Sequence, residues 1–357
     1  MKQKIRVLVV DDSAFARFAI ARQLQADPDI EVMDFARDGA EALEKVMARK
    51  PDVVTLDVEM PRMDGLTALE QIMAVCPTPV VMLSTLTGAG TQATIRALEL
   101  GAVDFFLKPS LTCPAGTDGT GDDLRTKLKV AAGVKASQLG TTVSPVPVRS
   151  KPERHVEGRS APPNGAVVIG SSTGGPRALY QVIPALPAGI PAVILVVQHM
   201  PPGFTKSMAD RLNELSEIMV KEAEAGDMLR QGEAFVAPGG YHMTVKKDRV
   251  IDLNQTPPVC GVRPSVDVTM ESVTQAFGAA TMGVVLTGMG SDGTNGTSCI
   301  KAAGGKVIAE DESTCSVYGM PKSVADAGNA DRIVPLPRIA SELVRMLNSK
   351  ERLKSKS

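Results

Sequence analysis

The sequence predicts an α/β protein with two domains of this class in series. Its 357 residues are enough for two hydrophobic cores. In each half, short β-branched runs alternate with amphipathic helical segments, and a stretch rich in proline, serine and charge lies between the halves. This alternation implies parallel sheets with right-handed crossovers.

Five strands are expected in the first half, over the runs RVLVV, IEVMDF, DVVTL, PVVML and VDFFL. The segments between them, such as 40–49 and 91–100, have the apolar spacing of amphipathic helices. This order predicts a (βα)5, flavodoxin-like domain. The functional site of such a sheet lies at the carboxyl ends of its strands.

Residues 123–163 are predicted to form a linker. A helix over 124–139 is expected to pack on the first domain. The stretch that follows, GTTVSPVPVRSKPERHVEGRSAPPNG, combines proline, serine and charge with almost no periodicity. That composition is typical of a linker.

Residues 164–350 are predicted to form a second, doubly wound and mainly parallel α/β domain. Its strands are expected over AVVIG, AVILVVQ, EAFVA, GVVLTG and KVIAE, with helical stretches between them. The segment YHMTVKKDRVIDL predicts an antiparallel hairpin inserted in this domain.

The composition argues against several classes of protein. The 39 basic and 40 acidic residues nearly cancel, which gives no general attraction to nucleic acid or anionic lipid. The five cysteines are scattered without a CxxC pair, which disfavours structural zinc and a disulfide framework. No signal peptide is apparent, nor a run of about 20 apolar residues. We therefore expect a cytoplasmic protein with no direct membrane insertion.

Polar side chains follow four of the five predicted strands of the first domain: Asp11 and Asp12, then Asp57, Ser84 and Lys108. Because the carboxyl ends of parallel strands meet at one edge, these groups would share a pocket. Crowded carboxylates are suited to Mg²⁺, and Mg²⁺ beside a lysine is what phosphoryl transfer to an aspartate requires. Each acid alone could simply cap a helix, but capping does not explain why the whole set lies at strand ends.

The order and context of these residues resemble the receiver domain of two-component response regulators over residues 4–122. The resemblance implies that Asp57 is the phosphoacceptor. It also implies that Asp11, Asp12 and Asp57 bind Mg²⁺ together with the backbone carbonyl of Glu59.

By the same resemblance, Ser84 and Lys108 contact the phosphoryl group, and Phe105 occupies an aromatic switch position. Many receivers have threonine in place of Ser84, and the hydroxyl is retained here. Many have tyrosine in place of Phe105, so this chain lacks that phenol hydroxyl.

The turn GSSTGG allows two interpretations: it could bind a phosphate through backbone N–H groups, or it could present a serine as a nucleophile. A P-loop would continue with Gly-Lys-Ser/Thr, but Pro176 follows the glycines. Gly170 and Gly174 do not have the spacing of a dinucleotide fingerprint. Residues 170–174 match G-x-S-x-G, which would expose Ser172 on a strand-to-helix turn.

A nucleophilic serine needs a base, and the chain has three histidines. His155 lies in the predicted linker, and His242 lies at a turn entering a strand. His199 ends the run AVILVVQ, and strands adjacent in sequence are often adjacent in a doubly wound sheet. A lone histidine more often makes structural hydrogen bonds, but beside an exposed Ser172 the role of base is favoured.

The base needs a carboxylate to orient it. Asp292 lies in the glycine-rich loop after the run GVVLTG. Ser-Asp-Gly could also be a simple turn, and the loop lacks the spaced acids of an EF-hand calcium site. The order Ser, His, Asp differs from that of the α/β-hydrolases, so that fold is not expected.

Seven motifs resemble the catalytic domain of the chemotaxis protein-glutamate methylesterase family. They are IGSSTGGPRAL, VVQHMPPGFTKSMADRLN, VKEAEAGD, APGGYHM, RPSVDVTMESV, LTGMGSDGTNG and YGMPKSV. Together with the receiver and the linker, the resemblance covers nearly all of residues 4–350.

This resemblance implies Ser172 as the nucleophile, because it directly precedes Thr-Gly-Gly, whereas Ser171 does not. It implies His199 as general base and acid and Asp292 as its orienting group. The backbone N–H of Met289 is implied as an oxyanion donor, and the N–H of His199 is a weaker candidate.

The implied reaction is hydrolysis of glutamyl γ-methyl esters on methyl-accepting chemoreceptors through an acyl-enzyme, with no cofactor for this step. Many members of the family also deamidate receptor glutamines. A chemotaxis histidine kinase is the expected phosphodonor for Asp57, and the receiver is expected to cover the active-site face until it is phosphorylated.

Two alternatives remain open at this level. The second half could be a non-catalytic binding module under receiver control, or an esterase for a protein ester outside chemotaxis. A DNA-binding output is disfavoured, because no basic recognition helix is apparent and the net charge is −1.

Overall fold

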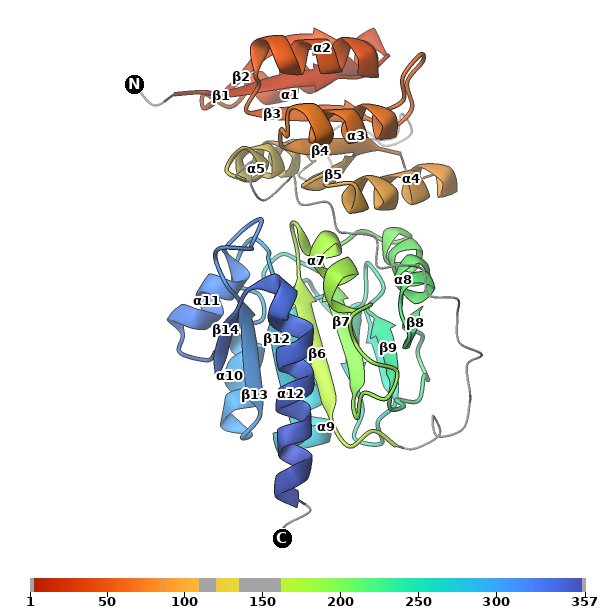
Figure 1. Cartoon of the computed structure of the whole chain (residues 1–357), viewed down its shortest axis with the longest axis vertical. Coiled ribbons are helices and arrows are strands. Elements are labelled where there is room, and N and C mark those ends of the chain that lie inside the picture. The colour runs from red at the N-terminus through yellow and green to blue at the C-terminus, as the bar shows by residue number, and fades with distance from the viewer. Residues whose placement is uncertain (1–2, 86, 109–119, 135–161, 355–357) are drawn as a thin grey trace. The chain divides into compact units, whose positions relative to one another are not determined.

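The computed structural model describes residues 3–85, 87–108, 120–134 and 162–354. The chain forms two compact units, Met1–Ser144 and Pro145–Ser357. Each unit contains a parallel sheet with helices packed on it (Figure 1). The predicted α/β class is therefore confirmed for both halves.

The N-terminal unit contains a five-stranded parallel sheet in the order β2-β1-β3-β4-β5. Its strands are β1 (Ile5–Val10), β2 (Ile30–Ala36), β3 (Val53–Asp57), β4 (Val80–Ser84) and β5 (Asp104–Leu107). Every residue of β3 and β4 is buried, as expected for central strands covered by helices on both faces. The predicted (βα)5 arrangement is confirmed.

The helices of this unit are α1 (Ala14–Gln25), α2 (Gly39–Arg49), α3 (Gly65–Val75), α4 (Gly88–Glu99) and α5 (Thr120–Ala132). The first four each begin at a side chain that accepts a hydrogen bond from the first-turn backbone, namely Ser13, Asp38, Asp64 and Thr87. Helix α1 packs with α5, while α3 packs with α2 and α4.

Helix α5 differs from its predicted bounds of 124–139. It begins at Thr120 in a polar turn that has no apolar periodicity, and it ends at Ala132 before a turn at Gly133. Residues 135–139 of that prediction lie outside the described residues. The apolar side chains Leu124 and Leu128 pack in the core of the N-terminal unit. The expectation that this segment packs on the first domain is therefore confirmed, and the predicted receiver boundary at residue 122 falls within α5.

The C-terminal unit contains a seven-stranded parallel sheet in the order β14-β13-β12-β6-β7-β9-β8. Its strands are β6 (Ala166–Ser171), β7 (Val193–Gln198), β8 (Met219–Glu222), β9 (Glu233–Val236), β12 (Thr281–Val285), β13 (Lys306–Glu310) and β14 (Arg332–Val334). The sequence did not predict β8 and β14. Both are edge strands of four and three residues, too short to establish a period.

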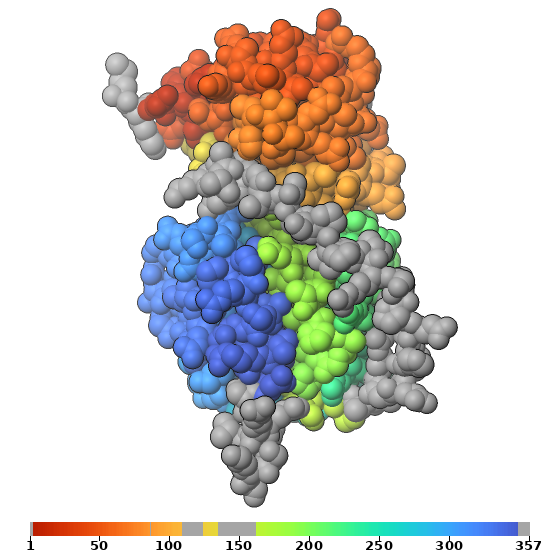
Figure 2. Space-filling model, in the orientation of Figure 1, coloured from red at the N-terminus to blue at the C-terminus, as the bar shows by residue number. Residues whose placement is uncertain are grey.

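Strands β10 (His242–Val245) and β11 (Ile251–Asn254) form the predicted antiparallel hairpin. The helices are α7 (Gly175–Val182), α8 (Phe204–Leu215), α9 (Val266–Phe277), α10 (Thr294–Ala302), α11 (Met320–Asp326) and α12 (Leu336–Lys354), with a 3₁₀ turn at Gly278–Ala280. In Figure 1, α7 and α12 lie in front of the central strands and α9 lies behind them. Helices α7 and α12 contact each other, and Figure 2 shows their blue and green surfaces meeting along a seam.

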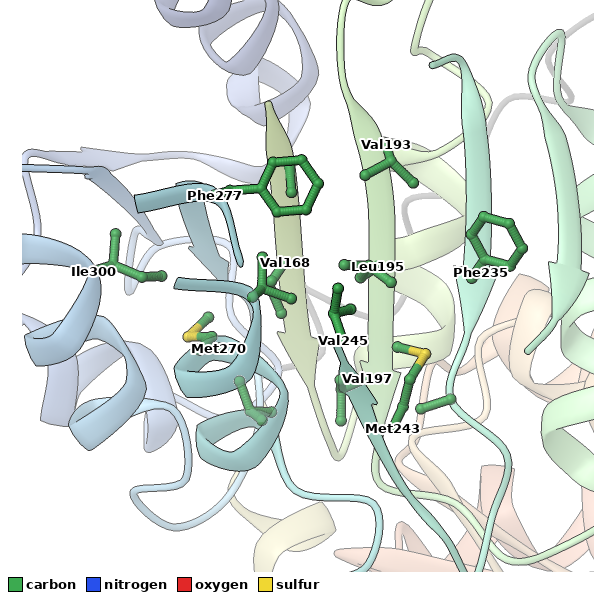
Figure 3. Close-up of a cluster of buried hydrophobic side chains, with 14 of the residues drawn as sticks. Val168, Val193, Leu195, Val197, Phe235, Met243, Val245, Met270, Phe277 and Ile300 are labelled. Atoms are coloured by element: carbon green, nitrogen blue, oxygen red, sulfur yellow. The ribbon is translucent and has the colours of Figure 1, made fainter. Parts of the chain in front are cut away.

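The core on the α9 side of the sheet joins the central strands, α9 and the hairpin. Figure 3 shows Val168 of β6 and Leu195 of β7 facing Met270 of α9 and Val245 of β10. All four side chains are buried. The hairpin is thus part of the core that holds α9 against the sheet. Among the described helices, none has both the length and the apolar character required to span a membrane.

The contact between β6 and α9 generates a stability prediction. A Cβ atom on Gly170 would lie 2.5 Å from Cγ1 of Val266. We therefore expect Gly170→Ala to lower the free energy of unfolding of the C-terminal unit by about 1–3 kcal/mol, through overpacking. Scanning calorimetry of the full chain measures this change in the transition of that unit.

The exposed Gly189 supplies the control, because a Cβ atom there would have no neighbour within 4 Å. Gly189→Ala should leave the transition unchanged or raise it slightly. Equal effects of the two substitutions would contradict this account of the β6–α9 contact.

Candidate active site

Ser172 and His199 are the first residues beyond two neighbouring strands. Strands β6 and β7 pair in parallel with Ser171 opposite Gln198, so the two chains leave the sheet side by side. The sequence-based expectation that these two strands are neighbours is confirmed. The carboxyl edge of the sheet therefore brings the predicted nucleophile and base together.

The buried side chain of Gln198 holds the two strand ends together. Its Nε2 donates hydrogen bonds to the backbone carbonyls of Ser172 and His199, both at 3.0 Å. Its Oε1 accepts a hydrogen bond of 2.7 Å from the Ser171 hydroxyl. This role of Gln198 was not predicted from the sequence. The one available signal was a polar residue at the end of the otherwise apolar run AVILVVQ.

The imidazole of His199 is hydrogen-bonded to Asp292. Nε2 of His199 lies 2.8 Å from Oδ2 of Asp292. When Nε2 donates its proton to the carboxylate, Nδ1 is the ring nitrogen left to accept a proton. Asp292 comes from the loop after β12, the strand that pairs with the other edge of β6. The three predicted residues thus come from three adjacent strands.

The N-terminus of α9 holds the Asp292 carboxylate. Its oxygens accept hydrogen bonds from the amides of Val266 and Asp267, at 2.7 and 3.0 Å, and from the Ser265 hydroxyl at 2.8 Å. Burial opposes ionisation, but the hydrogen bond and charge of His199 and these amides hold the pKa of Asp292 below its usual range. The carboxylate is therefore ionised and fixed in orientation.

Asp267 makes the converse interaction with α10. Its Oδ1 accepts hydrogen bonds of 2.9 and 2.7 Å from the amides of Gly293 and Gly296. Asp292, which precedes α10, thus binds the N-terminus of α9, and Asp267 of α9 binds the N-terminus of α10. Burial and the charge of Asp292 raise the pKa of Asp267, and the α10 amides oppose this shift. These reciprocal hydrogen bonds fix the loop that carries Asp292.

The loop after β12 also supports the turn that carries Ser172. The Ser172 amide donates to the Thr287 carbonyl at 3.1 Å, and the Thr287 hydroxyl donates to the Thr173 carbonyl at 3.0 Å. A Cβ atom on Gly288 would lie 2.8 Å from Cβ of Ser172 and 2.5 Å from Sδ of Met320. Only glycine permits this approach.

The Ser172 side chain itself remains free. It is half-buried, and among the described residues its hydroxyl forms no hydrogen bond. That state suits a group that must be reached by a substrate.

The peptide unit between Gly288 and Met289 is fixed from its carbonyl side. The Gly288 carbonyl accepts hydrogen bonds from the amides of Gly319 and Met320, at 3.2 and 2.8 Å. No acceptor within the described part of the chain bonds to the Met289 amide, which is therefore available as a donor. The His199 amide already donates to the Ser171 carbonyl at 3.1 Å, so it is not available to an oxyanion.

The other two histidines do not join this site. His242 is fully buried, and its Nε2 lies 3.2 Å from the Pro257 carbonyl oxygen. His155 lies outside the described residues.

The acidic residues of the N-terminal unit meet at the carboxyl edge of its sheet, as predicted. Carboxylate oxygens of Asp11, Asp12 and Asp57 lie within 4.8 Å of one another. The Lys108 ammonium lies 2.7 Å from Asp11 and 2.8 Å from Asp57. Burial, together with the charge of Asp11, raises the pKa of Asp57 to about 6, while Lys108 opposes the shift.

These donors fit a hard divalent cation. They are all carboxylate oxygens, and the exposed position of Asp12 leaves room for the waters that Mg²⁺ retains. Glu59 is exposed, two residues beyond β3, and its backbone carbonyl accepts no hydrogen bond from the described residues.

Ser84 is the last residue of β4, and Phe105 lies within the neighbouring strand β5. The buried Ser84 hydroxyl accepts a hydrogen bond of 2.7 Å from the Thr94 hydroxyl. Phe105 is buried, with the Lys127 ammonium 5.5 Å from the centre of its ring.

Comparison with known proteins identifies the families that this chain resembles. Residues 167–343 match the family model of the CheB methylesterase, and residues 7–112 match that of the response regulator receiver domain. The chain is 51% identical over 353 residues to a protein-glutamate methylesterase/protein-glutamine glutaminase of Symbiobacterium thermophilum, covering 97% of this chain and 98% of the relative. A relative of the same name from Pyrococcus abyssi is 49% identical, covering 96% and 94%.

A solved structure, the CheB methylesterase catalytic domain of Thermotoga maritima, is 49% identical with a TM-score of 0.50. The match covers 51% of this chain and 98% of the Thermotoga maritima catalytic domain. The chain therefore belongs to the family of protein-glutamate methylesterase/protein-glutamine glutaminases, enzymes with a receiver domain and a CheB methylesterase domain.

Proposed function

We propose that the chain hydrolyses γ-methyl esters of glutamate residues on methyl-accepting chemoreceptors, with Ser172, His199 and Asp292 as its catalytic residues. One observation carries the proposal. Ser172 follows the strand paired with that of His199, and the His199 imidazole is bonded to the ionised Asp292 at 2.8 Å.

In the first half of the reaction, Nδ1 of His199 takes the proton of the Ser172 hydroxyl while Oγ attacks the ester carbonyl carbon. The Met289 amide donates a hydrogen bond to the resulting oxyanion. The protonated His199 then gives its proton to the leaving methoxide, so that methanol departs and a glutamyl ester of Ser172 remains. Asp292 stabilises the positive charge on the imidazole throughout.

In the second half, His199 takes a proton from water, and the hydroxide attacks the acyl-enzyme carbonyl. Collapse of the intermediate returns the proton to Ser172 Oγ and releases the glutamate carboxylate. A receptor glutamine reacts by the same steps with ammonia as the leaving group, and we propose this deamidation as the second activity.

We further propose that a chemotaxis histidine kinase phosphorylates Asp57 and that this modification raises the hydrolase activity. Asp11, Asp12, Asp57 and the Glu59 carbonyl would hold Mg²⁺, which supplies charge neutralisation for the transferred phosphoryl group.

We propose that Lys108 and Ser84 contact the phosphoryl oxygens. The ion pair between Lys108 and Asp57, and the position of Ser84 at the end of the neighbouring strand, support this proposal. Phosphorylation adds a charge of about −1.5 to −2 to this pocket and changes the partners of Lys108.

Substitution of the nucleophile tests the catalytic assignment. We expect Ser172→Ala to reduce methanol release from a methylated chemoreceptor fragment by at least about 10³-fold, because the attacking oxygen is lost. Ser171→Ala is the matched control. It removes the hydrogen bond to Gln198 and should retain activity within about tenfold, as expected for one such bond. A fully active Ser172→Ala variant, or an inactive Ser171→Ala variant beside an active Ser172→Ala variant, would contradict the assignment.

Substitution of the phosphoacceptor tests the control mechanism. We expect acetyl phosphate with Mg²⁺ to increase methanol release by the wild-type chain and to leave Asp57→Asn at its basal rate. Glu70→Gln, an exposed charge change on α3, should respond like the wild type. Stimulation that persists in Asp57→Asn would show that phosphorylation acts elsewhere.

A further inference from the structure

Glu310 is a buried carboxyl group that the proposed reaction does not use. It ends β13 and is fully buried. Its Oε2 accepts a hydrogen bond of 2.8 Å from the Thr287 amide, and its Oε1 accepts one of 3.0 Å from the Thr314 hydroxyl. Both oxygens therefore act as acceptors, as expected of an ionised carboxylate.

No basic side chain of the described residues forms an ion pair with Glu310. Among the described side chains, the charged groups on the elements packed against β13 are paired with one another or exposed. Lys301 of α10 pairs with Asp331, Lys322 pairs with Asp326 within α11, and both Arg332 of β14 and Arg345 pair with Glu342 of α12, while Arg338 is exposed. Strand β12 carries no titratable group.

The titratable neighbours of Glu310 are Asp311 and the Cys315 thiol. Burial raises the pKa of Glu310 to about 7, the charge of Asp311 adds to the shift, and the hydrogen bonds from Thr287, Thr314 and Cys315 oppose it.

Thr287 connects Glu310 to the active site. Its amide is bound by Glu310, while its carbonyl accepts the Ser172 amide and its hydroxyl donates to the Thr173 carbonyl. Met289, the proposed oxyanion donor, lies two residues further along the same loop. Glu310 thus holds the peptide on which both the nucleophile turn and the oxyanion loop depend.

We propose that Glu310 is a positioning residue, whose carboxylate fixes residues 287–289 by accepting the Thr287 amide and whose protonation loosens this loop. The inference rests on the proposed function, because it takes Ser172 as the nucleophile and the Met289 amide as the oxyanion donor.

The hydrogen bonds around Glu310 can serve both protonation states. In the neutral acid, the new O–H donates to the Thr314 hydroxyl oxygen, whose own proton turns to the Asp311 carbonyl at 3.3 Å. The Thr287 amide then faces a neutral acceptor, and the charge-assisted hydrogen bond is lost.

Ionisation of Glu310 lowers the stability of the fold, whereas it is proposed to increase the activity. The pKa of Glu310 rises from its usual 4.5 to about 7 on folding, so the folded chain binds more protons than the unfolded chain between these values. The stability contributed by the protonated group is complete below about pH 4.5 and is lost as the pH rises to about 7. An ionised group that destabilises the fold at neutral pH is more readily explained by a role in activity.

Glu310→Gln tests the inference, because glutamine has nearly the same shape and mimics the neutral acid. We expect the ratio of wild-type to variant kcat/KM for methanol release to be about one at pH 6. It should rise to on the order of tenfold at pH 8.5, the value of one charge-assisted hydrogen bond. The variant should also have the higher melting temperature at pH 8.5.

Glu233→Gln is the matched control. Glu233 is a buried carboxyl group at the first residue of β9, at the amino edge of the same sheet and away from the site. The ratio of wild-type to Glu233→Gln kcat/KM should not change with pH. If the ratio for Glu310→Gln does not depend on pH but the melting temperature shifts as expected, the role of Glu310 is purely structural. That result would overturn this inference and leave the proposed function intact.

A second measurement needs no variant. Hydrogen exchange of the wild-type peptide that contains Thr287 should become more protected, relative to its intrinsic rate, as the pH rises through about 7. Protection that is constant or falls with pH would overturn the inference even if the variant does not fold. A wild-type chain that releases no methanol at any pH would instead overturn the proposed function, and with it this inference.

Discussion

The pairing of β6 with β7 on one side and β12 on the other is the constraint on which the active site depends. Parallel pairing brings the ends of three strands that are distant in sequence to one edge of the sheet. The loops that follow these strands therefore begin side by side. Ser172, His199 and Asp292 are the polar residues that those loops place together. Gln198 then links the first two loops through their carbonyls, and the amides of α9 link the third. The order of the strands in the sheet thus determines which residues meet at its carboxyl edge.

The two units stabilise crowded carboxylates in different ways. In the N-terminal unit, Asp11 and Asp57 share the Lys108 ammonium, so their arrangement depends on a point charge at the end of a long side chain. In the C-terminal unit, Asp292 and Asp267 are held by backbone amides at helix N-termini, which are fixed dipoles. The first arrangement suits the phosphoacceptor proposed for Asp57, and the second suits the orienting role proposed for Asp292.

The residues that could be predicted from the sequence lie at the end of an apolar strand or in the loop that follows it, because the parallel sheet brings such positions to one edge. Ser172 and His199 directly follow their strands, Asp57 ends β3, and Asp292 lies in the loop after β12. Gln198 and Glu310 also end strands, but their roles could not be predicted, because they depend on hydrogen-bonding groups of other loops. The same holds for Asp267, whose carboxylate binds amides of α10 and of the residue before it. The start of helix α5 was misplaced because its first turn is polar, and β8 and β14 were missed because they are too short to show alternation.

The carbonyl of Gly288 is held by two amides at the start of α11, a helix of only seven residues. A helix this short has little cooperativity of its own and depends on packing against β12 and β13. The segment that orients the proposed oxyanion donor is therefore among the elements most prone to open locally while the sheet stays intact. Heat inactivation of such an enzyme would precede its global melting, and the gap between the two temperatures would report the fraying of one helical turn.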